Sequence, residues 1–159
     1  MRRLIAAIAA PLAASAAPMA DYAEPYRLLQ QANLALDPVL ATSAYADDAR
    51  LTFHYPVRPA EAFRGHEAIR ASYIRTFGQV DPESPIRLEF RFEPPGLSVA
   101  RQWGVYRIDA RVSGRPVEVY GRFAVELVRT DAGWRFAQDR GWPATATDFN
   151  KLPPTQLGK

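Results

Sequence analysis

The chain has 159 residues and no cysteine, which excludes a disulfide framework, a thiol nucleophile and a lipid-anchoring cysteine. Its 20 Lys and Arg exceed its 17 Asp and Glu, but two of the basic residues, Arg2 and Arg3, stand at the very start of the chain. The other arginines are scattered and form no basic stripe, so a nucleic-acid partner is not expected.

Residues 1–17 have the features of a signal peptide. A positively charged start precedes a short apolar run over 4–12, and small residues follow at 14–16, where a signal peptidase would cut. The apolar run is shorter than the roughly 20 residues that a membrane-spanning helix needs. We therefore expect a periplasmic or secreted bacterial protein, with no stable membrane insertion after cleavage. The remainder is expected to form one domain over 21–142 and a loosely held C-terminal extension over 143–159.

After a first helix that contains Tyr26, two further helices are predicted in the N-terminal half. One of these begins at Asp37 and Pro38. An Asp side chain accepts hydrogen bonds from the free backbone amides at a helix start. Proline lacks a backbone N–H, and at the first helical position that N–H would have no partner within the helix. The other covers residues 65–77, in which three apolar side chains recur at intervals of four and form one buried stripe. These three residues are Ile69, Tyr73 and Phe77.

Strands are predicted in the remaining segments. Leu51 and Phe53 alternate with polar residues, and a second alternating segment covers 86–93. A long strand is predicted over 97–112, where the apolar positions change from odd to even numbers around Gly104, which predicts a bulge or a sharp bend. Two further strands follow at 117–127 and 134–142, with tight turns between the strands. Long, bent, antiparallel strands fit a curled sheet wrapped by the N-terminal helices.

Four short motifs occur in order along the chain. They are YADDA at 45–49, G-x-E-A-I-R at 65–70, G-R-F-A-V at 121–125 and G-W-R-F-A-Q-D at 133–139. In this order and spacing they resemble the SnoaL-like and nuclear transport factor 2-like families. The resemblance implies an α+β fold in which N-terminal helices pack in a strongly curved antiparallel sheet and form a cone-shaped pocket. Such scaffolds carry isomerases, dehydratases, epoxide hydrolases and binding modules alike, so the fold alone does not specify a reaction.

Two enzyme groups of this superfamily supply catalytic hypotheses. By resemblance, the two carboxylates of ketosteroid isomerases fall at Phe53 and near Phe123, and phenylalanine cannot accept a proton, so steroid isomerase chemistry is not expected. Limonene-type epoxide hydrolases carry an Arg-x-Asp on the middle strand, matched by Arg107 and Asp109, and a second Asp on the last strand, near Asp139. The competing interpretation is that Arg107 and Asp109 form an ion pair on the wet face of the sheet, which is worth only ~0–1 kcal/mol.

The expected pocket is aromatic and suits a small apolar or aromatic molecule. Its predicted lining residues are Tyr26, Phe53, Tyr55, Tyr73, Trp103, Phe123 and Trp142. No metal or other cofactor is expected, because neither histidine has a second ligand at a recognised spacing. A dehydratase could use His54 with Tyr55 if a bulge inverted the strand.

The leading prediction is an exported small-molecule-binding domain. One alternative is a cofactor-free hydrolase or dehydratase that uses Arg107, Asp109 and Asp139. The other is a module that forms homodimers through the outer sheet face, to which Tyr120, Arg122 and Val128 could contribute.

Overall fold

The computed structural model describes residues 21–158. The predicted signal peptide, and with it the prediction of export, lies outside these residues. The helices are α1 (Glu24–Ala35), α2 (Pro38–Ser43), α3 (Gly65–Phe77), the short 3-10 helix η1 (Gly96–Ser98) and α4 (Ala146–Asn150). The strands are β1 (Tyr45–Phe53), β2 (Glu61–Arg64), β3 (Arg87–Phe92), β4 (Arg101–Val112), β5 (Arg115–Thr130) and β6 (Gly133–Pro143). Within the described part of the chain, no helix is long and apolar enough to cross a membrane.

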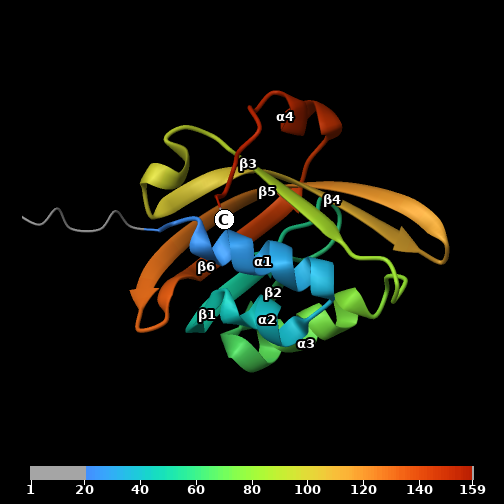
Figure 1. Ribbon diagram of the computed structural model, residues 1–159, viewed down its shortest axis with the longest axis horizontal. Helices are drawn as coiled ribbons and strands as arrows, with labels where there is room; N and C mark the ends of the chain where they lie inside the picture. The colour runs from blue at the N-terminus through green and yellow to red at the C-terminus, as the bar shows by residue number, and fades with distance from the viewer. Residues whose placement is uncertain (1–20, 159) are drawn as a thin grey trace, which may run out of the picture.

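The six strands form one curved sheet in the order β2-β1-β6-β5-β4-β3. Helices α1, α2 and α3 lie on one side of this sheet, and α4 lies on the other (Figure 1). The predicted α+β class with N-terminal helices packed in a curved sheet is confirmed. The sheet is mixed rather than wholly antiparallel, because β1 runs parallel to β6. These two strands are not joined by a hairpin, so no turn in the sequence fixes their relative direction.

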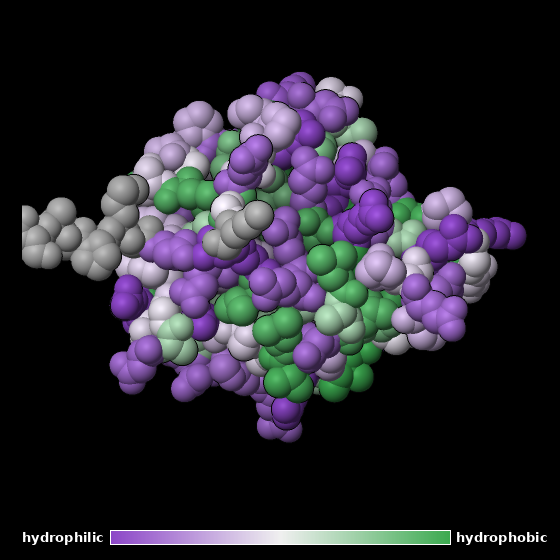
Figure 2. Space-filling model, in the orientation of Figure 1, coloured by the Kyte–Doolittle hydropathy of each residue, from purple (hydrophilic) through white to green (hydrophobic). Residues whose placement is uncertain are grey.

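The predicted helix signals are confirmed. Asp37 Oδ1 accepts hydrogen bonds from the amides of Val39 and Leu40 at 2.9 and 3.0 Å and caps α2. In α3, Ile69 and Phe77 are buried and the whole stripe packs against the core. Figure 2 shows that these helices also leave apolar side chains on the surface, over α2 and α3. The stripe that attaches α3 to the sheet is therefore only part of its apolar surface.

Tyr26 of α1 lies at the centre of the core, with 1% of its surface exposed. Its ring centroid lies 4.9 Å from the rings of Phe90 and Phe92, 5.0 Å from that of Phe136 and 5.9 Å from that of Phe123. Its hydroxyl donates to Gln102 Oε1 at 2.6 Å, which satisfies a side chain that is itself buried. Tyr26 thus joins α1 to four strands of the sheet.

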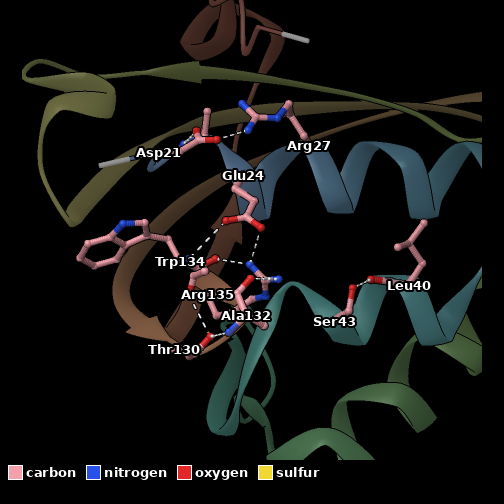
Figure 3. A network of polar contacts seen from close by, with 11 residues as sticks. Asp21, Glu24, Arg27, Leu40, Ser43, Thr130, Ala132, Trp134 and Arg135 are labelled. Carbon is pink, nitrogen blue, oxygen red and sulfur yellow. Dashed lines mark hydrogen bonds and ion pairs between the residues drawn. The ribbon is translucent and has the colours of Figure 1, made fainter. Parts of the chain in front are cut away.

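A polar network fixes the start of α1 to the start of β6 (Figure 3). The Glu24 carboxylate lies 3.0 Å from Arg135 Nη1 and accepts a hydrogen bond from the Trp134 amide at 3.3 Å. The same guanidinium donates to the carbonyls of Trp134 and Ala132 at 2.7 and 2.8 Å. Since Arg135 is almost fully buried, these contacts satisfy a charge that would otherwise be costly to bury.

The strand that the sequence predicts over 97–112 begins later and contains no bulge. Strand β4 starts at Arg101, after η1, and its pairing with β5 continues through Gly104 without a shift, while Gly104 is the last residue that pairs with β3. A Cβ at Gly104 would collide with the Arg91 carbonyl oxygen and the Phe123 ring, so glycine is needed for close packing rather than for a bend. The apolar residues change from odd to even positions because both faces of β4 are covered. Tyr106 faces the helices, and Val105 is buried on the side where α4 packs.

The C-terminal extension is held firmly, contrary to the prediction of a loose segment. Phe149 of α4 is fully buried, and the guanidinium of Arg91 lies 4.0 Å from the centre of its ring. Arg91 also donates to the carbonyl of Leu152 at 2.9 Å, and Arg27 donates to the carbonyl of Leu157 at 2.8 Å. One buried aromatic ring and two charge-assisted hydrogen bonds therefore attach a segment whose composition is mostly polar.

Candidate functional site

A cavity of about 130 Å³ lies between the N-terminal helices and the concave face of the sheet. Eight of its eighteen lining residues are Phe or Tyr, and one, Asp139, has a carboxyl group. Four of the predicted pocket residues line it, namely Tyr26, Phe53, Tyr73 and Phe123. The cavity is therefore aromatic, with a single carboxyl group.

The other three predicted pocket residues lie elsewhere. Trp103 points away from the cavity and is 41% exposed, because its neighbour Gln102 occupies the inward position. Trp142 is 37% exposed, and its ring stacks on that of His54 with centroids 4.8 Å apart. Tyr55 follows the end of β1, where its ring lies 3.5 Å from the guanidinium carbon of Arg58. Strand alternation places both tryptophans on the outer face, and His54 with them.

A bulge in β6 brings Asp139 into the cavity. Phe136 and Asp139 both line the cavity although they are three residues apart. Phe136 pairs with Leu127 and Gln138 pairs with Glu126, so Ala137 is an extra residue on β6. An extra residue reverses the alternation of the side chains that follow it. Without the bulge, Asp139 would face the outside of the sheet.

Two tyrosines hold the Asp139 carboxyl. The Tyr45 hydroxyl, from β1, donates to Asp139 Oδ2 at 2.8 Å. The hydroxyls of Tyr45 and Tyr73 lie 3.0 Å apart. Since the single proton of Tyr45 is given to Asp139, Tyr73 of α3 is the donor in this second bond. Oxygen Oδ1 of Asp139 accepts no hydrogen bond from residues 21–158 and is not a fully buried atom, so a molecule in the cavity can reach it.

Burial raises the pKa of Asp139 to about 6, and the hydrogen bond from Tyr45 opposes this shift. No cationic side chain in the described part of the chain contributes to the pKa of this carboxyl. Burial and the nearby Asp139 raise the pKa of Tyr106 to about 12 and that of Tyr45 well above its usual value. At neutral pH the site therefore consists of a mostly ionised carboxyl surrounded by neutral phenols.

Tyr106 supplies a further hydroxyl to the cavity. It pairs with Gly121 across β4 and β5, and a Cβ at Gly121 would collide with the phenol carbon and hydroxyl oxygen of Tyr106. Glycine thus lets the ring lie close over the β5 backbone. The hydroxyl has no hydrogen-bond partner within residues 21–158, so a bound molecule can use it.

Arg107 and Asp109 do not belong to this site. They alternate with Tyr106 and Ile108, which line the cavity, and therefore lie on the outer face. There Arg107 Nε is 3.1 Å from Asp109 Oδ2, and Arg107 Nη2 is 3.3 Å from Glu89 Oε2. The hydrolase arrangement of Arg107, Asp109 and Asp139 is not assembled, because the sheet lies between the ion pair and Asp139.

The outer-face residues suggested for self-association are partly covered. Arg122 donates to Asp148 Oδ1 of α4 at 2.7 Å, and the Tyr120 ring lies 5.6 Å from that of Phe149. Val128 is exposed. Helix α4 therefore occupies the outer face at Tyr120 and Arg122, and homodimer formation stays a prediction.

Sequence reasoning missed the roles of Tyr45 and Tyr106. Tyr45 lines the cavity together with Leu51 and Phe53, but the pairing of β1 with β6 shifts register between Tyr45 and Arg50, so even spacing along the sequence does not place it there. Tyr106 belongs to the even-numbered set that includes Ile108, and that set lines the cavity. Alternation along β4, which pairs with β5 without a shift, could therefore have indicated Tyr106, whereas Tyr45 has no such signal.

No protein-family model matches the chain, and no curated protein matches it. Solved structures do match. Bal32a from a soil-derived mobile gene cassette is 21% identical, with a TM-score of 0.56 over 83% of this chain and 95% of that one. The chain has the nuclear transport factor 2-like fold.

Two other structures with this fold have names that mention a ligand or an activity. A protein with a ketosteroid isomerase-like fold from Catenulispora acidiphila, in complex with trimethylamine, is 14% identical with a TM-score of 0.57, covering 82% of this chain and 94% of that one. A limonene epoxide hydrolase-like enzyme of Mycobacterium tuberculosis is 15% identical with a TM-score of 0.54, covering 82% and 87%. At these identities the likeness concerns the nuclear transport factor 2-like fold and not the chemistry.

Proposed function

We propose that this protein binds a small molecule of about one ring, largely apolar, in the cavity beside Asp139. The observation that carries the proposal is an aromatic cavity with one carboxyl oxygen, Asp139 Oδ1, left without a protein partner. Binding sites of this type combine apolar walls with a few polar groups that orient the ligand.

The volume of the cavity limits the ligand. Pockets for drug-sized ligands measure about 300–1,000 Å³, whereas an apolar cavity of about 150 Å³ accepts benzene. A cavity of about 130 Å³ is therefore suited to a single ring or a branched group of similar size. The trimethylamine bound by the Catenulispora protein is a molecule small enough for such a space.

Titrations monitored by NMR would test this function. We expect chemical-shift changes at cavity residues with phenol, benzyl alcohol and cyclohexanol, and none with naphthol or a steroid. Ile108→Phe should abolish binding, because it fills the cavity, whereas Val128→Phe on the outer face is the matched control and should bind as the unmodified protein does. The proposal fails if no single-ring molecule binds, or if Ile108→Phe leaves binding unchanged.

A second candidate function is proton transfer by Asp139. A carboxyl with a pKa of about 6 is a base close to neutral pH, the range in which general bases are most effective. Asp139 Oδ1 could remove a proton beside a carbonyl group, while the Tyr106 hydroxyl could donate to the oxygen on which negative charge develops. Isomerisation and dehydration of small carbonyl compounds both begin with this step.

Deuterium loss from ring-deuterated cyclohexanone at pH 7.5 tests this candidate. We expect the protein to accelerate exchange above the buffer rate, and Asp139→Asn to lose about 100-fold or more of this acceleration. Asp109→Asn, which removes an outer-face carboxylate, is the control and should keep the full rate. Exchange at the buffer rate with the unmodified protein would exclude proton transfer on this substrate class and leave the binding function intact.

A further inference from the structure

The charge of the cavity is not balanced by the protein. Asp139 forms no ion pair within residues 21–158, and its one hydrogen-bond donor is the neutral Tyr45 hydroxyl. On the sheet its neighbours are Leu51 of β1 and Val125 of β5, both apolar. A buried carboxylate normally pairs with a cation or takes up a proton, because burial without compensation is costly. Near pH 7.5 this carboxylate therefore has negative charge but no protein counterion.

The walls of the cavity also favour positive charge. Rings from seven elements surround it, among them Phe53 of β1, Tyr73 of α3 and Tyr106 of β4. A cation within about 6 Å of an aromatic ring centre is attracted to the face of the ring, most strongly where water is excluded. In a cavity of about 130 Å³, any occupant lies within reach of several rings and of Asp139.

A metal ion does not fit this site. No group of three or more His, Cys, Asp or Glu side chains occurs together in the described residues. Hard metal cations need several oxygen ligands, and here the one carboxyl stands among neutral phenols and apolar side chains. A cation that has lost its water without needing oxygen ligands must have an apolar surface of its own, as alkylammonium ions do.

We propose that the ligand of this cavity is a small organic ammonium ion, held by the Asp139 carboxylate and the surrounding aromatic rings. This inference rests on the proposed binding function and specifies its ligand class. The ammonium group lies beside Asp139 Oδ1, its alkyl or aryl part fills the ring-lined space, and the Tyr106 hydroxyl can pair with a polar group at the other end of the ligand.

Isothermal titration calorimetry tests the proposal, with pairs of ligands that have the same shape but differ in charge. Choline has 3,3-dimethylbutan-1-ol as its neutral counterpart, and benzylamine has benzyl alcohol. At pH 7.5 we expect each cation to bind at least about tenfold more tightly than its neutral partner. A tenfold difference in affinity corresponds to about 1.4 kcal/mol, and we expect the attraction of the cation to the rings and the carboxylate to exceed this. Because this comparison uses the unmodified protein, it does not depend on the folding of any variant.

Variants then assign the preference to Asp139. Asp139→Asn should lower the affinity for each cation to about that for its neutral partner, whereas Asp109→Asn should keep the cation preference. If the neutral partners bind as tightly as the cations in the unmodified protein, the ammonium proposal is wrong and the binding function stands. If neither member of any pair binds, and no other single-ring molecule does, the proposed function itself fails, and the ammonium proposal with it.

Discussion

Tyr26→Ala is expected to lower the free energy of unfolding by about 4 kcal/mol or more. Removal of a buried aromatic side chain costs about 3–5 kcal/mol, since the transfer energy of the ring is lost and a cavity remains. Tyr26 is 1% exposed and contacts four phenylalanine rings. The substitution also leaves the buried Gln102 Oε1 without its donor, which adds to the cost. Urea denaturation followed by fluorescence and circular dichroism would measure the change.

Two further variants separate the contributions of ring and hydroxyl. Tyr26→Phe keeps the ring and removes the hydrogen bond to Gln102, so a loss of about 1–3 kcal/mol is expected. Tyr22→Ala removes a less buried ring, which contacts Trp134 at a centroid distance of 4.7 Å, and should cost less than Tyr26→Ala. Equal losses for Tyr26→Ala and Tyr22→Ala would show that Tyr26 is not the centre of the core.

The helix start at Asp37 and the buried face of α3 could be predicted from short segments of the sequence. Asp37 caps its helix through hydrogen bonds to residues two and three positions later, so the sequence contains everything that this helix start needs. The apolar stripe of Ile69, Tyr73 and Phe77 is likewise a property of one helix. These elements could be predicted because their stabilising contacts are close in sequence.

The orientation of β4 could not be predicted in this way. Hydrophobicity favours Trp103 inside and Gln102 outside, yet Gln102 is buried and Trp103 is exposed. The inversion is possible because the Tyr26 hydroxyl, 76 residues earlier, gives Gln102 a hydrogen bond. A polar residue can face the core when a distant partner satisfies it, and the sequence does not show that partner.

Asp139 was recognised as a candidate and was given the wrong partners. Its grouping with Arg107 and Asp109 rested on the resemblance to limonene-type epoxide hydrolases, whereas only Asp139, turned inward by the extra residue Ala137, lines the cavity. Its actual partner, Tyr45, belongs to the parallel neighbour strand β1. Neither the bulge nor the parallel pairing has a signal in the local sequence.

Asp139→Asn should make the protein more stable at pH 7 to 8, because it removes a half-buried carboxylate whose charged form is disfavoured in the folded protein. The pKa of Asp139 is raised from 3.8 to about 6 in the folded protein. Between these values the folded state keeps a proton that the unfolded state releases, so the contribution of this group to stability falls as the pH rises from about 4 to about 6. Above about pH 6 this loss of stability is complete. A shift of about two pKa units corresponds to about 3 kcal/mol in the free energy of unfolding.

The free energy of unfolding of Asp139→Asn minus that of the unmodified protein should therefore be near zero at pH 4 and rise to about 3 kcal/mol at pH 8. Urea denaturation at one-unit pH intervals would measure this difference, in which titrations shared by both proteins cancel. The groups that face Asp139 from β1, α3 and β4 are Tyr45, Tyr73 and Tyr106, whose raised pKa values keep them neutral over this range. Asp109→Asn, on the outer face, should show no such rise. A difference that stays constant between pH 4 and pH 8 would mean that the Asp139 carboxylate is not destabilised in the folded protein, and the reason to expect a cationic ligand would disappear with it.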